Sequence, residues 1–227
     1  MRTLKAKPCT WRSFPFPTLL VRALNTVGLE ERDISVVNIS DADLVSAFQT
    51  DDVRHVATWN PLLAEVAAYP GATKLFDSSQ IPGHIKDLTL VNSETLEDNP
   101  KLGKALVGAW YETMSILASD SAEGEEARAF LGELSGTDRA GYEAQLAGMK
   151  MFWEPQMSVA FINSDETREA MDSVRQFSFD KGLLGQGAMS PDFVGIEFPD
   201  GSIMGDEANV KLRFNDSYMQ MAADGEI

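Results

Sequence analysis

Along the first ninety residues, apolar positions switch between helical spacing and short, strand-like runs. A helical repeat predicts a helix over residues 19–27 that ends at Gly28. Ser40 and Asp43 form an S-x-x-D capping box and predict the start of a second helix. The apolar runs predict strands over residues 33–37, 53–59, 73–76 and 87–91. This alternation indicates an α/β fold with parallel strands and crossover helices.

Parallel strands bring the segments that follow them to a common edge, where open α/β sheets bind ligands. The predicted strands therefore place residues 38–43, 59–60 and 77–80 at one edge of the sheet.

From Asn99 onward the pattern becomes mainly helical. We expect a long helix to residue 118, short helices within 119–148, a helix over 165–180, a hairpin over 194–204 and a last short helix capped by residues 215–217.

Composition and charge narrow the classes of function. The 227 residues are 44% hydrophobic and include one cysteine, so a core is feasible and an internal disulfide is excluded. Nineteen basic residues against 35 acidic ones give a net charge of −16, which argues against nucleic-acid binding. Residues 1–29 hold five basic residues and no acid, yet Pro15 and Pro17 interrupt the apolar run that a secretory signal needs.

Catalytic signatures are sparse. His55 and His84 lack the spacing of a metal site, and Cys9 has no base nearby in sequence. The glycines of residues 182–187 follow a helix and not a strand, so they do not form a phosphate-binding loop. The sequence predicts no catalytic residue, no metal and no cofactor, and hence a protein that is not an enzyme.

Two features are candidates for ligand binding, and each also has a purely structural interpretation. Trp59 is either a rim or core aromatic or a wall for a planar or cationic ligand, and Trp153 has the same two interpretations. Asp41 and Asp43 either stabilise a helix dipole or accept hydrogen bonds from an amide or guanidinium group. These carboxylates disfavour sulfonate and nitrate.

Several extended strings resemble the solute-binding proteins of ABC importers that are encoded beside urea carboxylase, within the broader taurine, nitrate and sulfonate type. The strings are residues 37–43, 56–61, 76–83, 99–106, 174–180 and 194–201. The resemblance implies a type II periplasmic binding protein fold, a periplasmic location, a membrane permease as partner, and urea or a urea-like compound such as guanidine as the solute. The ligand-binding residues that we expect are Ser40, Asp41, Asp43, Trp59, Asn60, Ser79 and Gln80.

The chain departs from that family at its start. We expect residues 1–87 to be the second α/β lobe, and residues 88–227 to be the returning part of an incomplete first lobe with C-terminal helices and the small hairpin. The resemblance implies a signal peptide and a front half of the first lobe, and we expect this chain to lack both. Residues 9–18 replace an expected strand with a proline-interrupted segment, which suggests a frame-shifted stretch.

These departures predict weak ligand binding by the chain alone. Three alternatives stay open: a sulfonate- or nitrate-type solute, an enzyme on the same fold of the kind that makes a thiamine precursor, and a non-functional gene remnant.

Overall fold

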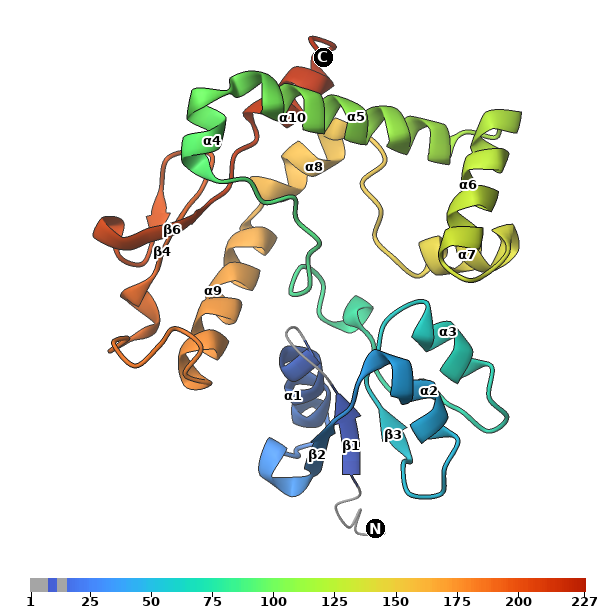
Figure 1. Cartoon of the computed structure of the whole chain (residues 1–227). Helices are drawn as coiled ribbons and strands as arrows, with labels where there is room; N and C mark the ends of the chain where they lie inside the picture. The colour runs from blue at the N-terminus through green and yellow to red at the C-terminus, as the bar shows by residue number, and fades with distance from the viewer. Residues whose placement is uncertain (1–7, 12–15) are drawn as a thin grey trace. The chain divides into compact units, whose positions relative to one another are not determined.

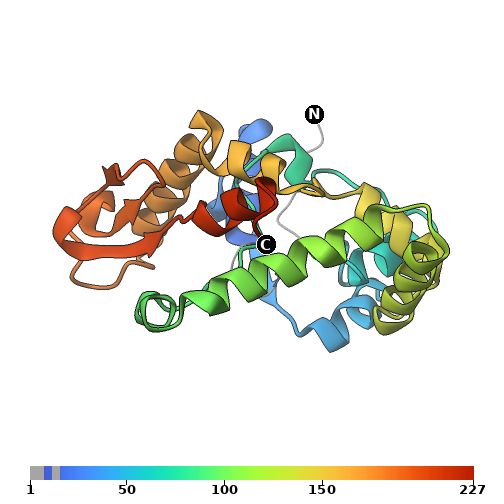
Figure 2. The same ribbon diagram turned by 90° about the horizontal axis from the view of Figure 1, so that it is seen from above.

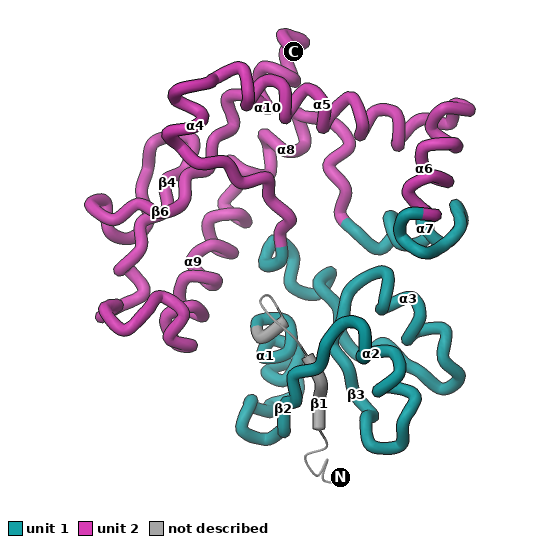
Figure 3. Tube along the Cα trace, in the orientation of Figure 1, with its two compact units in different colours: residues 1–85, 134–149 teal, residues 86–133, 150–227 magenta. Residues whose placement is uncertain are grey.

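The computed structural model describes residues 8–11 and 16–227, and the chain divides into two compact units (Figures 1 and 3). Unit 1 comprises residues 1–85 and 134–149, and unit 2 comprises residues 86–133 and 150–227. The chain first passes from unit 1 to unit 2 between residues 85 and 86, two residues before the predicted lobe boundary between residues 87 and 88. The assignment of these units to the second and first lobes of a binding protein stays a prediction.

Unit 1 contains a three-stranded parallel sheet in the order β2-β1-β3. Its strands are β1 (Pro8–Trp11), β2 (Ser35–Asn38) and β3 (His55–Val56). Cys9 pairs with Val36 on one side and with His55 on the other, so β1 is central. The predicted α/β class with parallel pairing is confirmed.

The start of the chain corrects one prediction. Residues 9–18 were expected to lack a strand, yet Pro8–Trp11 forms the central one. Pro17 falls in the first turn of α1 (Phe16–Thr26), where its missing N–H group costs no helical hydrogen bond. Pro15 lies outside the described residues.

The helices of unit 1 include those predicted on both sides of β2. They are α1, α2 (Asp41–Phe48), α3 (Leu62–Ala67) and α7 (Arg139–Ala147), with short 3₁₀ turns at Glu31–Asp33 and Ser78–Gln80. Gly28 ends α1 with a φ of 71°, and the Leu29 N–H group donates to the Leu24 carbonyl at 3.0 Å. This left-handed C-terminal cap confirms the predicted helix end.

Two predicted strands are absent. Residues 73–76 and 87–91 have no ladder partner among residues 8–11 and 16–227, and Leu75 and Leu90 are 78% and 73% exposed. The predicted strand over 53–59 is reduced to His55–Val56. A short apolar run becomes a strand only where a neighbouring strand accepts its hydrogen bonds and a packed face covers it.

Unit 2 has its own small sheet, in the order β5-β4-β6. The strands are β4 (Gly195–Glu197), β5 (Ile203–Met204) and β6 (Val210–Arg213). The predicted hairpin is confirmed as the antiparallel β4–β5 pair, whereas the parallel partner β6 was not predicted. The core consists of Met171, Ile196, Phe198 and Phe214. The rings of Phe198 and Phe214 stack with their centroids 5.7 Å apart.

Helices make up the rest of unit 2. They are α4 (Ser93–Asp98), α5 (Pro100–Ala118), α6 (Ala122–Leu134), α8 (Pro155–Ile162), α9 (Asp165–Asp180) and α10 (Ser217–Ala223). The predicted long helix and the helix over 165–180 are confirmed. α10 packs against α5 and α8 (Figures 1 and 2). The last short helix is confirmed, but its N-cap residue, Asp216, makes no side-chain cap bond. The Asn215 side chain, one residue earlier, accepts a hydrogen bond from the Ser217 N–H group at 2.9 Å.

Candidate functional site

The carboxyl edge of the unit 1 sheet carries two of the predicted segments. β2 and β3 run parallel on either side of β1, so the segments that follow them leave the sheet at the same edge. One segment leads to Ser40 and α2, and the other leads to Trp59, Asn60 and α3. α2 packs against α3. The rings of Phe48 and Tyr69 pack edge to face, with their centroids 5.9 Å apart. We call residues 39–43 and 57–61 the unit 1 edge.

At the start of α2, two side chains bind each other. The Ser40 hydroxyl group donates to the Asp43 carboxylate, and the Asp43 N–H group donates to the Ser40 carbonyl at 3.1 Å. The helix begins where the predicted S-x-x-D motif places it, with Ser40 at the N-cap position, but the capping box itself does not form, because the Ser40 side chain accepts no hydrogen bond from the backbone of α2. Asp41 is half-buried beside this pair. The two carboxylates give this end of the edge a negative charge that suits a cation or an N–H donor.

Trp59 supplies a large aromatic surface at the other segment. Its side chain is 42% exposed, which excludes the core interpretation and leaves a rim position or a ligand wall. Its carbonyl accepts a hydrogen bond from Leu63 at 2.8 Å and so anchors the start of α3. Asn60, which precedes a cis peptide bond to Pro61, is half-buried. The neighbouring Thr58 Oγ1 is buried and has no hydrogen-bond partner within the described part of the chain.

Ser79 and Gln80 lie in the 3₁₀ turn and are exposed. The Asp77 carboxylate accepts from the Ser79 N–H group at 3.0 Å and pairs with the Lys74 ammonium group at 2.5 Å. The bonds from Lys74 and then Ser79 hold the pKa of Asp77 below its usual value. Because the strand predicted before this turn is absent, the sheet does not place Ser79 and Gln80 at the unit 1 edge. Their role in binding stays a prediction.

Unit 2 holds a group of charged and aromatic side chains that the sequence analysis missed. The Lys150 ammonium group lies 4.9 Å from the ring centroid of Phe161 and 5.7 Å from that of Phe152. The Lys86 ammonium group lies 5.7 Å from the same Phe161 centroid. The only sequence signal was the closeness of Lys150 to Phe152, because Lys86 and Phe161 lie far away along the chain. Trp153, the second aromatic candidate, is half-buried next to Phe152.

Burial affects the two lysines differently. Lys86 is half-buried, and loss of solvent lowers its pKa, while the charge of Glu166 acts in the opposite direction. Lys150 is exposed. We call Lys86, Lys150, Phe152 and Phe161 the lysine–phenylalanine cluster.

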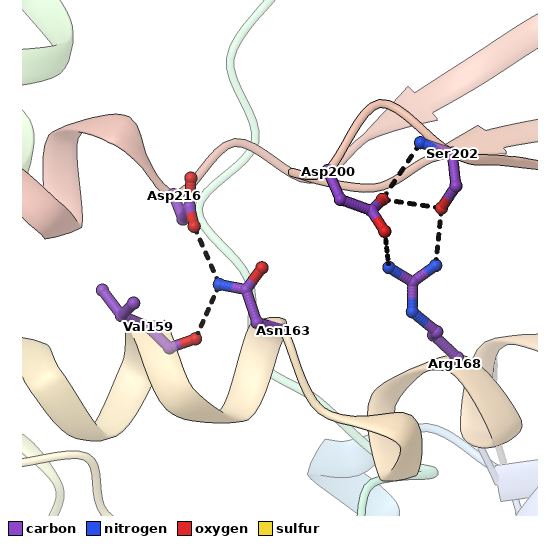
Figure 4. Close-up of polar contacts among 6 residues, drawn as sticks. All are labelled: Val159, Asn163, Arg168, Asp200, Ser202 and Asp216. Carbon is purple, nitrogen blue, oxygen red and sulfur yellow. Dashed lines mark hydrogen bonds and ion pairs between the residues drawn. The ribbon is translucent and has the colours of Figure 1, made fainter.

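A second polar group in unit 2 has a structural role (Figure 4). The Arg168 guanidinium group donates to Asp200 at 2.8 Å and to Ser202 at 2.7 Å, and it lies 4.2 Å from the ring centroid of Phe198. Asn163 donates to the Asp216 carboxylate at 2.8 Å. These bonds tie α9 to the β4–β5 hairpin and α8 to α10.

Within residues 8–11 and 16–227, no group of three or more His, Cys, Asp and Glu side chains is placed to hold a metal ion. No helix among the described residues has the length and apolar character needed to cross a membrane.

Comparison with known proteins gives a structural match and no sequence match. Neither a protein-family model nor a curated protein matches the chain. The structure is similar to that of the alkanesulfonate-binding protein SsuA from Xanthomonas axonopodis pv. citri bound to MOPS, with a TM-score of 0.57 and 20% identity. The match covers 81% of this chain and 60% of that protein.

The comparison confirms the predicted fold: the chain has the mixed α/β fold of periplasmic binding proteins. The matched protein is a solute-binding protein, which agrees with the prediction that the chain is not an enzyme. It belongs to the sulfonate type, whereas the predicted resemblance was narrower and pointed to the urea-associated group. The chain spans about three-fifths of the length of its structural neighbour.

Proposed function

We propose that the chain is the solute-binding component of an ABC importer. The observation that carries this proposal is the fold, which is similar over 81% of the chain to that of a solute-binding protein with a small molecule bound. A periplasmic location and a membrane permease as partner belong to the same proposal. Binding proteins of this class close two lobes around an unchanged solute, so they need recognition groups and no catalytic ones.

The solute that we propose is urea or a urea-like compound such as guanidine. The unit 1 edge supports this choice, because Asp41 and Asp43 offer carboxylate oxygens to N–H donors and Trp59 offers an exposed ring. A guanidinium group forms paired hydrogen bonds with a carboxylate and stacks on an aromatic face. Asn60 adds an amide that can both donate to and accept from urea.

A sulfonate- or nitrate-type solute is the second candidate. It is favoured by the structural neighbour, whose bound MOPS is a sulfonate. The carboxylates of the unit 1 edge disfavour such an anion there, so the two candidates differ in the sign of the charge that the edge accepts.

A nuclear magnetic resonance titration tests the proposal, because it detects weak as well as tight binding. The ¹⁵N-labelled chain is titrated with urea and with guanidinium at millimolar concentrations. We expect the indole N–H signal of Trp59 and the side-chain amide of Asn60 to shift and saturate. Trp110, which is 53% exposed on α5, is the internal control for non-specific solvent effects.

Two variants sharpen the titration. Asp41→Asn removes one negative charge from the unit 1 edge, and we expect it to weaken guanidinium binding more than urea binding. Asp120→Asn removes an exposed charge between α5 and α6 and is the matched control. Equal shifts for Trp59 and Trp110, with no saturation, would contradict binding at the unit 1 edge.

A further inference from the structure

Thr58 brings a buried hydroxyl group to the unit 1 edge. The residue is half-buried and lies between the end of β3 and Trp59. Its Oγ1 atom is buried and has no hydrogen-bond partner among residues 8–11 and 16–227. Such a group costs free energy on folding, because it gives up its bonds to water and gains none from the protein.

Two other threonines of unit 1 show what the chain does with a hydroxyl group elsewhere. Thr26 Oγ1 donates to the Ala23 carbonyl at 2.7 Å. Thr50 Oγ1 donates to the Ala47 carbonyl, also at 2.7 Å. Both groups bond the protein although they are exposed and water is within reach, whereas the buried hydroxyl of Thr58 bonds none of the described residues. The contrast indicates that Thr58 keeps a hydrogen bond open for a group from outside the chain.

The unit 1 edge needs donors as well as acceptors if it is to bind urea. Ionised Asp41 and Asp43 accept hydrogen bonds and donate none. Ser40 already donates its hydroxyl hydrogen to Asp43. Asn60 adds one amide that donates, and Thr58 adds a hydroxyl donor that no described residue uses.

Urea and guanidinium differ in the feature that a hydroxyl donor detects. Urea has a carbonyl oxygen with two lone pairs, whereas guanidinium has only N–H donors and a positive charge. Carboxylates alone favour the cation. A buried donor changes this balance, because urea pairs with it and guanidinium leaves it unpaired, and an unpaired buried donor carries the full desolvation penalty.

We propose that the Thr58 hydroxyl group donates a hydrogen bond to the carbonyl oxygen of the bound solute and makes the unit 1 edge prefer urea to guanidinium. This inference rests on the proposed function and adds a recognition group and a solute class to it: a neutral compound with both a carbonyl oxygen and N–H groups. Rotation about the Cα–Cβ bond exchanges the hydroxyl and methyl positions of a threonine, so the hydroxyl turns toward a solute without a change in the backbone.

The test compares solute binding by the full chain and by variants at this position. Thr58→Val replaces the hydroxyl with a methyl group of similar size. We expect it to weaken urea binding by about three- to tenfold, the effect of one lost hydrogen bond, and to leave guanidinium binding unchanged. Thr58→Ser keeps the hydroxyl, and we expect it to bind urea like the wild type. Dissociation constants come from the shift of the Trp59 indole N–H signal in the ¹⁵N-labelled chain.

Thermal unfolding without solute distinguishes a recognition group from a structural one. We expect Thr58→Val to melt at or above the temperature of the wild type, because it removes a buried polar group that lacks a partner. The matched control is Thr50→Val, which removes a bonded hydroxyl of unit 1 outside the unit 1 edge. We expect this control to bind urea and guanidinium like the wild type.

The outcomes separate this inference from the proposed function. Unchanged urea binding in Thr58→Val overturns the inference, as does an equal loss of urea and guanidinium binding, or a wild type that prefers guanidinium. In these cases solute binding itself stands. A Thr58→Val chain that melts well below the wild type overturns the inference too, because the hydroxyl is then bonded in the free chain. If the wild type binds neither urea nor guanidinium, the solute choice of the proposed function fails together with the inference.

Discussion

At the residue scale, Arg168 shows how one side chain joins a helix to a hairpin. Its guanidinium group bonds Asp200 and Ser202 across the tip of the β4–β5 hairpin and covers the buried ring of Phe198. Bonds from Ser202 and then from Arg168 lower the pKa of Asp200 from 3.8 to about 2. The ionised carboxylate is therefore favoured in the folded state.

The lowered pKa of Asp200 predicts a pH-dependent contribution to stability. Because the folded pKa is below the unfolded one, the contribution is complete above the unfolded pKa of 3.8 and is lost as the pH falls toward about 2. Asp200→Asn keeps the side-chain oxygen that accepts from Ser202 and removes the charge. We expect this variant to melt below the wild type at neutral pH, with a difference that narrows between pH 5 and pH 2. Thermal unfolding followed by circular dichroism measures it.

Asp120→Asn is the control for this pH series, since it removes another exposed carboxylate of unit 2. A melting difference for Asp200→Asn that stays constant from pH 7 to pH 2 would show that the carboxylate charge contributes nothing.

Sequence spacing predicted some contacts at this scale but not their direction. The S-x-x-D spacing placed Ser40 and Asp43 together, and the structure joins them with the serine as donor. The lysine–phenylalanine cluster was out of reach, because Lys86 meets Phe161 only through the fold of unit 2. A residue's chemistry can be read from the sequence, whereas its distant partner cannot.

At the element scale, the contact between α5 and α10 depends on a residue without a side chain. A Cβ atom at Gly103 would lie 2.4 Å from the Cε2 and Cζ atoms of Tyr218 on α10. Gly108, further along α5, has no atom within 4 Å of the same position. The two glycines thus share a helix, but an added methyl group would meet the Tyr218 ring at Gly103 and open space at Gly108.

This pair predicts stability changes of opposite sign. Gly108→Ala raises the helix propensity of α5, and we expect it to increase the free energy of unfolding by about 0.5–1 kcal/mol. Gly103→Ala forces the Tyr218 ring away, and we expect a loss of about 1–3 kcal/mol. The measurement is thermal unfolding, because urea and guanidinium are candidate ligands. A stabilising Gly103→Ala would contradict the described packing of α5 and α10.

Elements with strong local signals were predicted well, and elements that depend on distant partners were not. α5 and α9 have an apolar stripe and a clear start, at Pro100 and at Ser164, and both formed as predicted. β1 and β6 were missed because strands so short are specified by the neighbours that accept their hydrogen bonds. The opposite error, a strand that was predicted over residues 73–76 and did not form, has the same cause.

At the scale of the whole molecule, a high negative charge coexists with exposed apolar side chains. The net charge is −16 and the isoelectric point is about 4.4. Trp110 on α5 and Phe130 on α6 are 53% and 61% exposed. Charge repulsion opposes association through such surfaces, and salt weakens that repulsion.

We therefore expect the chain to self-associate as salt increases or as the pH approaches 4.4. Sedimentation velocity at low and high sodium chloride measures the association. Phe130→Ser is expected to reduce it. Met189→Ser, at a residue of the loop before β4 that is 89% exposed, is expected to leave it unchanged. Association that is independent of both salt and Phe130 would contradict this account.

The central claim is that the segments after β2 and β3 act together as one ligand surface. Hydrogen–deuterium exchange of the whole chain, with and without saturating urea or guanidinium, tests this most directly. We predict that the solute slows exchange in residues 39–43 and 57–61 together, while α5 is unaffected. Slower exchange in only one of these segments, or in neither while the solute binds elsewhere, would contradict the claim.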